Sequence, residues 1–156
     1  MTRRILWFFS LSLFLGLWAE AQTPANRPGH SDRERLLGAW RLVKIESAGP
    51  DGKAVPGPQP AGMLTYTKDG HMSVQLMYSG KAISNEYVEQ GYEASFGSFT
   101  IDESRHLVTH HVQGSVTRNR LVGKDLPRRF EFTSDGQLLI RSANPEEHWL
   151  VTWEKY

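Results

Sequence analysis

The protein has 156 residues and no cysteine, and its 18 lysines and arginines nearly balance its 17 aspartates and glutamates. The absence of cysteine excludes a disulfide-stapled module and a lipoprotein acylated on cysteine, because both need that side chain. The balanced charge gives no indication of nucleic acid or an acidic lipid surface as a partner.

The first 21 residues have the pattern of a secretory signal peptide. The basic start Met1–Arg4 precedes an uncharged apolar run, Ile5–Trp18, and Ala19-Glu20-Ala21 fits the small-x-small pattern of a cleavage site. The apolar run has 14 residues, fewer than the roughly 20 that a transmembrane helix needs. We therefore predict cleavage after Ala21, a periplasmic or secreted mature protein, and no stable membrane insertion after cleavage.

The mature chain is long enough for one domain. Cleavage leaves 135 residues with 16 basic and 16 acidic side chains, which suffices for one core and is too short for two. Residues 22–34 are polar and contain proline and glycine, so we predict a flexible linker there and a domain at 35–156. Ser31 or Asp32 is placed to cap a short turn of helix that runs to Leu37.

The clearest element of the domain is a β-hairpin within 62–78. Leu64 and Tyr66 alternate with threonines before Asp69-Gly70, and Met72, Val74 and Leu76 alternate with polar residues after it. Asp-Gly tolerates the positive φ angles of a tight turn, and the period of two turns one apolar face toward a core. A single hairpin is only marginally stable, so more strands must pack beside it.

The other expected elements are mostly short strands. They lie at 38–46, 96–101, 106–117, 127–133, 137–142 and 148–155. Gly114 predicts a bulge or sharp bend in its strand, and 84–94 is predicted to form a short helix that serves as a cap or plug. About eight strands without βαβ alternation favour an all-β antiparallel meander with one short helix. Pairing of the first strand with the last would close it into an up-and-down barrel.

Longer strings of the chain resemble a known family. Gly38-Ala39-Trp40 is similar to the G-x-W of the lipocalin and wider calycin group. Further strings resemble the bacterial and fungal lipocalin-like domain family over essentially all of Leu36–Tyr156: LLGAWRLV at 36–43, GMLTYTKDGHMSVQLM at 62–77, YEASFGSFTID at 92–102, LVTHHVQGS at 107–115, PRRFEF at 127–132 and LVTWEKY at 150–156. The resemblance implies a small calycin-type barrel with an internal cavity and with Trp40 stacked under a basic side chain at the closed end. It implies no settled activity.

His110 and His111 are neighbours on a predicted strand, so their side chains point to opposite faces and cannot readily bind one metal ion. His110 shares its face with Val108 and Val112, which makes it the inward one. It is compatible with a hydrogen bond to a buried tyrosine or carboxylate, with a ligand contact, or with acid–base catalysis. No metal-ligand spacing, phosphate loop or nucleophile motif is found, so we predict no metal site and no cofactor.

Arg128 has the same parity as Phe130 and Phe132 and should point inward. It is compatible with a cation–π contact to Trp40 or Trp153, or with a ligand carboxylate. Most aromatic side chains are expected to be core, with Tyr66 and Phe99 the first choices for a pocket.

The predicted ligand-contacting residues are Tyr66, Val74, Phe99, His110, Arg128 and Trp149. The leading hypothesis is an exported protein that binds a small, largely apolar molecule in the barrel. One alternative is an enzyme of the isomerase, cyclase or hydratase type that uses His110 and Tyr66 as acid–base groups. Another is a filled barrel that acts as an envelope interaction module.

Overall fold

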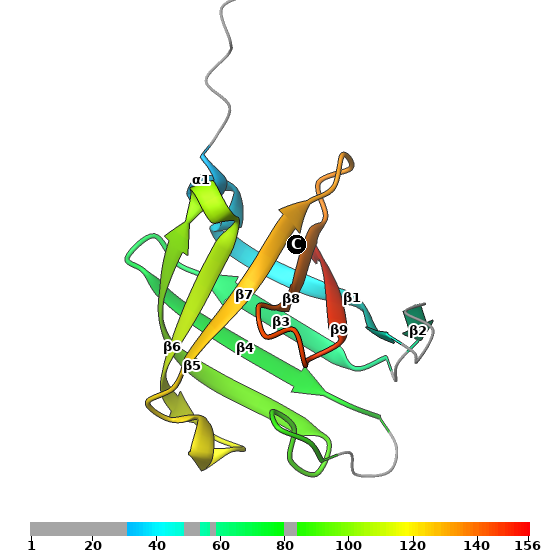
Figure 1. The fold of residues 1–156 in the computed structure, drawn as a ribbon. Coiled ribbons are helices and arrows are strands. Elements are labelled where there is room, and N and C mark those ends of the chain that lie inside the picture. The colour runs from blue at the N-terminus through cyan, green and yellow to red at the C-terminus, as the bar shows by residue number, and fades with distance from the viewer. Residues whose placement is uncertain (1–30, 49–53, 57–58, 80–83) are drawn as a thin grey trace, which may run out of the picture.

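A computed structural model describes residues 31–48, 54–56, 59–79 and 84–156 (Figure 1). The predicted signal peptide at 1–21 and the predicted linker as far as residue 30 lie outside the described residues. Among the described residues, no helix is long and apolar enough to cross a membrane.

The chain folds into a closed antiparallel barrel of eight strands (Figure 1). Strands β1 and β3 to β9 pair in chain order, and β1 also pairs with β9 between Trp40 and Ser47, which closes the barrel. The short strand β2 pairs with the end of β1. The elements are α1 (Asp32–Leu36), β1 (Gly38–Ala48), β2 (Ala54–Pro56), β3 (Ala61–Tyr66), β4 (His71–Met77), β5 (Tyr92–Asp102), η1 (Glu103–Arg105), β6 (Leu107–Ser115), η2 (Asn119–Leu121), β7 (Asp125–Phe132), β8 (Leu138–Ser142) and β9 (Trp149–Lys155).

The predicted all-β up-and-down barrel is therefore confirmed, and so is the central hairpin. Leu64 of β3 pairs with Val74 of β4, and both side chains are buried. Gly70 takes a φ of 91° in the connecting turn, a conformation that glycine adopts without steric cost. The strand β2 and the 3₁₀ helices η1 and η2 were not predicted from the sequence, since each has only three residues.

One end of the barrel is closed by α1. Ser31 and Glu34 form a capping box at its start, which satisfies two backbone N–H groups. Leu36 is fully buried, and its carbonyl accepts a 2.7 Å hydrogen bond from Nε1 of Trp40. Lys155 lies 5.0 Å from the centre of the Trp40 ring, as the family resemblance implies. The helix begins at Asp32, within the segment predicted as linker.

The predicted helix at 84–94 is wrong, because this segment is a loop that leads into β5 at Tyr92. The side chain of Asn85 accepts hydrogen bonds from the backbone N–H groups of Tyr87 and Val88, both at 2.8 Å. Such local bonds offer the backbone an alternative to a helix. Gln90 and Gly91 then take φ angles of 50° and 84°, which no α-helix accommodates.

The irregularity predicted at Gly114 is present. Phe96 pairs with Gly114 whereas Gly97 pairs with Val112, so β6 carries one extra residue at this point. A Cβ atom on Gly97 would lie 1.9 Å from the carbonyl oxygen of His111. The close approach of β5 and β6 therefore requires glycine at position 97.

The half of the barrel next to α1 is filled with side chains. Its buried residues include Leu36, Trp40, Tyr66, Phe99, Phe130 and Leu138. The other half contains a cavity.

Candidate functional site

The cavity has a volume of about 290 Å³ and lies toward the end of the barrel opposite α1. This volume is near the lower end of the range of roughly 300–1,000 Å³ typical of small-molecule sites. Most of the wall is apolar or aromatic: Ile45, Leu64, Val74, Leu76, Tyr78, Tyr87, Val88, Val112, Leu121, Leu126, Ile140, Trp149, Val151 and Trp153. The polar residues of the wall are Ser47, Asn85, Glu93, Ser95, His110 and Arg128.

Four of the six predicted ligand-contacting residues line this cavity, namely Val74, His110, Arg128 and Trp149. Tyr66 and Phe99 are not among the described residues of its wall. Their rings pack edge to face with centroids 4.8 Å apart in the filled half of the barrel. Parity predicted correctly that both point inward, but not at which height of the barrel they lie.

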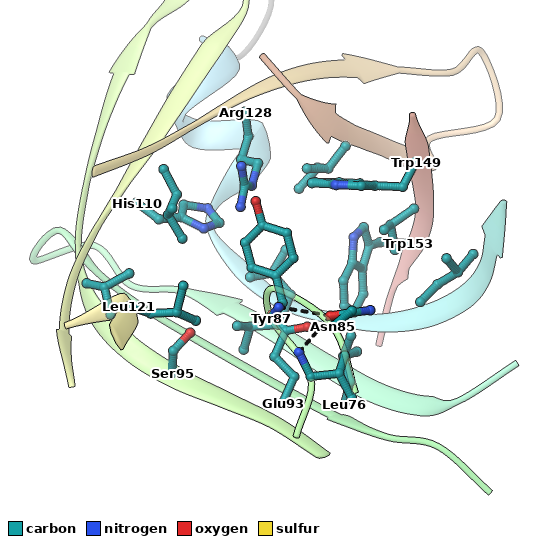
Figure 2. A pocket seen from close by; sticks show the side chains of 18 of the residues that line it. Leu76, Asn85, Tyr87, Glu93, Ser95, His110, Leu121, Arg128, Trp149 and Trp153 are labelled. Atoms are coloured by element: carbon teal, nitrogen blue, oxygen red, sulfur yellow. Dashed lines mark hydrogen bonds between the residues drawn. The ribbon is translucent and has the colours of Figure 1, made fainter. Parts of the chain in front are cut away.

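Arg128 is the cationic residue of the wall, and its side chain points into the hollow half (Figure 2). The residue is only 6% exposed. Its guanidinium carbon lies 5.0 Å from the ring centre of Tyr87 and 4.9 Å from that of Trp149. The predicted cation–π contact therefore exists, but the prediction of Trp40 or Trp153 as its partner is wrong, since Trp40 belongs to the closed end.

The guanidinium of Arg128 has few polar partners. It donates a hydrogen bond of 3.3 Å to the carbonyl of Pro127 and interacts with the Tyr87 side chain, although a guanidinium carries five N–H donors. No carboxylate of the described residues lies within ion-pair distance of it. No protein carboxylate therefore pairs directly with the guanidinium, although its charge reaches Glu147.

Glu147 holds the two aromatic rings beside Arg128. Its Oε2 accepts hydrogen bonds from the Tyr87 hydroxyl at 2.6 Å and from Nε1 of Trp149 at 2.9 Å. Partial burial raises the pKa of Glu147, but the hydrogen bonds from Tyr87, Trp149 and Ser142, with the charge of Arg128, hold this pKa below its ordinary value. The ionised carboxylate thus joins the loop before β5 to the loop before β9.

Glu93 is a second ionisable group of the wall, on β5 opposite Leu76. Among the described residues, the carboxyl of Glu93 forms no hydrogen bond and no ion pair. Burial raises its pKa to about 7, although the charge of Arg128 acts in the opposite direction. Figure 2 shows Glu93 and Arg128 on opposite sides of Tyr87.

His110 contacts both the cavity and the filled half. One of its ring nitrogens, Nε2, lies 2.7 Å from the hydroxyl oxygen of Tyr66, so the predicted hydrogen bond to a buried tyrosine is present. Burial and the charge of Arg128 lower the His110 pKa to about 3, and burial raises the Tyr66 pKa above its usual range. Both groups are neutral near pH 7. Efficient acid–base catalysis needs a pKa near the working pH, so this pair gives the enzyme hypothesis no support.

His111 lies on the outer face, as the alternation of strand side chains predicted. Its Nδ1 is 2.6 Å from Oδ1 of Asp125, and its Nε2 is 2.9 Å from the hydroxyl of Thr100. The three residues bridge three neighbouring strands outside the barrel. No group of three histidine, cysteine, aspartate or glutamate side chains is placed to hold a metal ion in the described part of the chain.

Sequence reasoning missed Glu93, Asn85 and Tyr87. Glu93 has the inward parity of Phe99, so a strand that began at Tyr92 would have identified it. A helix was predicted for 84–94 instead. Tyr87 was recognised as aromatic, but nothing in its sequence context connects it with Arg128.

Comparison with known proteins agrees with the architecture. The family model of a lipocalin-like domain matches residues 37–156, which include every strand of the barrel. No curated protein matches the chain.

Proposed function

The chain belongs to the lipocalin-like domain family, and from this premise we propose that its barrel cavity binds a small, largely apolar molecule that carries a carboxylate. The apolar walls would hold the body of the ligand, and Arg128 would hold its acidic end. Fold alone does not determine function, so the proposal depends on the chemistry of this cavity.

The observation that carries the proposal is the buried guanidinium of Arg128 without a protein carboxylate beside it. A buried charge is costly unless it is paired and hydrogen-bonded. The rings of Tyr87 and Trp149 lie close to the guanidinium, but neither ring offers the carboxylate that an arginine binds best. A carboxylate matches the N–H edge of a guanidinium with two parallel hydrogen bonds.

Neighbouring acids do not compete for Arg128. Glu147 is already occupied by the Tyr87 hydroxyl and the Trp149 indole. The pKa of Glu93 is raised to about 7, and this residue lies on the opposite side of Tyr87 from Arg128 (Figure 2). An anionic ligand would therefore supply the charge that the protein does not.

We also propose that the protein acts outside the cytoplasm. The support is the basic, apolar and small-x-small pattern of residues 1–21. The denatured mass of protein recovered from the envelope or medium of producing cells should correspond to a chain that begins at Gln22. A mass that includes residues 1–21 would contradict cleavage.

The binding proposal can be tested by titration calorimetry with decanoate and decanol on the mature protein. Decanoate should bind more tightly, and Arg128→Met should weaken decanoate by roughly ten- to a hundredfold while decanol changes little, since a charge-assisted hydrogen bond contributes about 1.5–3 kcal/mol. Arg129→Met on the exposed side of the same strand is the matched control and should change neither. Failure of both probes to bind, or equal loss of both in Arg128→Met, would contradict the proposal.

A further inference from the structure

Glu93 is an ionisable group of the cavity that the proposed function does not use. Its carboxyl lines the same wall as the apolar side chains, yet it has no hydrogen-bonding partner among the described residues. Glu93 is half-buried, and a carboxyl turned away from bulk water without a protein partner loses part of the hydrogen bonding that water would give it. A protein that only needed apolar surface at this position would gain stability from leucine there.

The position of Glu93 differs from that of Arg128. Glu93 lies near the start of β5, whereas Arg128 lies in β7, and Figure 2 shows them on opposite sides of the cavity with Tyr87 between them. The groups of the wall around Glu93 are Leu76 across the strand pair and Ser95 two residues along the same face. The two ionisable side chains therefore lie at different places in the cavity, with the ring of Tyr87 between them.

We infer that Glu93 is a second anchor of the binding site, which hydrogen-bonds an oxygen at the end of the ligand remote from its carboxylate. This inference rests on the proposed function and narrows the ligand to an apolar acid with a hydroxyl or carbonyl group at its far end. A purely hydrocarbon tail would leave the Glu93 carboxyl unpaired in the complex.

The protonation of Glu93 agrees with this role. Burial holds its pKa at about 7, so the group is mostly a neutral carboxyl in mildly acidic solution. A neutral carboxyl has an O–H donor as well as an acceptor oxygen. The charged or titratable groups that face the same cavity are Arg128, His110, Tyr78 and Tyr87, and none of them is an anion near neutral pH.

A site that hydrogen-bonds a ligand oxygen discriminates against the analogue that lacks it, because its own polar group then stays unpaired. The test compares decanoate, ω-hydroxydecanoate and ω-methoxydecanoate by titration calorimetry, about one pH unit below the Glu93 pKa. The mature wild-type protein should bind both oxygenated acids about tenfold more tightly than decanoate, which corresponds to one hydrogen bond.

The variants then assign this preference to Glu93. Glu93→Leu should remove it and leave decanoate as tight or tighter, whereas Glu93→Gln should retain it, because the amide also donates. Arg128→Met should weaken all three acids and keep the preference. Thermal unfolding of each variant checks that it is folded. The comparison of the three acids on the wild-type protein does not depend on the folding of any variant.

The outcomes separate the two proposals. If none of the acids binds, the proposed function itself is wrong. If decanoate binds through Arg128 but the three acids bind equally tightly to the wild type, only the role of Glu93 is overturned. A preference that persists in a folded Glu93→Leu variant would also overturn it.

Discussion

Individual side chains of this barrel acquire their properties from partners far away in the sequence. His110 was predicted to be inward because of its parity with Val108 and Val112, and the structure buries all three. Its partner Tyr66 lies 44 positions earlier in the chain, and parity carries no information on which inward residues meet. The same limit explains why the ring partners of Arg128 were assigned wrongly.

The bond between Tyr66 and His110 should stabilise the fold. Tyr66→Phe removes the hydroxyl and leaves Nε2 of a buried, neutral imidazole without its partner. We expect the free energy of unfolding to fall by about 1–3 kcal/mol, which is the cost of an unsatisfied buried polar group. Urea denaturation near pH 7 measures this change.

A double-mutant cycle with His110→Leu tests the cause. If the loss in Tyr66→Phe arises through His110, the same substitution in the His110→Leu background should cost much less. An equal cost in both backgrounds would instead assign the effect to packing of the tyrosine ring.

At the scale of elements, strand periodicity predicted the strands well and the mouth of the cavity poorly. Alternating sequences such as Leu64–Leu76 have a single buried face, so their register follows from the pattern. The segment 84–91 has no such period, and its conformation depends on the Asn85 side chain and on the positive φ angles at Gln90 and Gly91. Asn85, Tyr87 and Val88 of this segment line the cavity, and its role as a cap stays a prediction.

Glu147 should order the two loops at this mouth. It accepts hydrogen bonds from Tyr87 in one loop and from Trp149 at the end of the other. Glu147→Ala should release both rings from Arg128 and lower the affinity for decanoate roughly fivefold, equivalent to about one net hydrogen bond.

Calorimetry of Glu147→Ala measures this loss, and Glu146→Ala is the control. Glu146 is exposed in the same loop, and among the described contacts it uses only its backbone N–H, toward Asn144. Unchanged affinity in Glu147→Ala, or equal losses in both variants, would contradict the ordering role.

At the scale of the whole molecule, closure of the barrel was predictable and its filling was not. The count of strands without βαβ alternation favoured a meander that closes by pairing its first and last strands, and β1 does pair with β9. Whether a barrel of this size is filled depends on side-chain volumes summed around each layer. Trp40, Tyr66 and Phe130 fill the layers next to α1, whereas the layers around Val74 and Glu93 leave a cavity.

The stability of the whole barrel should respond to pH through two groups of the cavity wall whose pKa values are shifted in opposite directions. His110 has its pKa lowered from 6.5 to about 3, so the unfolded state binds more protons between these values and stability is lost as pH falls through this range. Glu93 has its pKa raised from 4.5 to about 7, so the folded state binds more protons there and stability is lost as pH rises through that range.

The two contributions oppose each other where the ranges overlap, between about pH 4.5 and 6.5. Glu93→Gln removes one of them. The free energy of unfolding of this variant minus that of the wild type should therefore increase as pH rises from 4.5 to 7, whereas the corresponding difference for His110→Leu should decrease as pH rises from 3 to 6.5. Urea denaturation across this pH series measures both differences. The contributions of the carboxylates that all three proteins share cancel in each difference. A difference for Glu93→Gln that does not vary with pH would show that Glu93 ionises normally in the folded barrel.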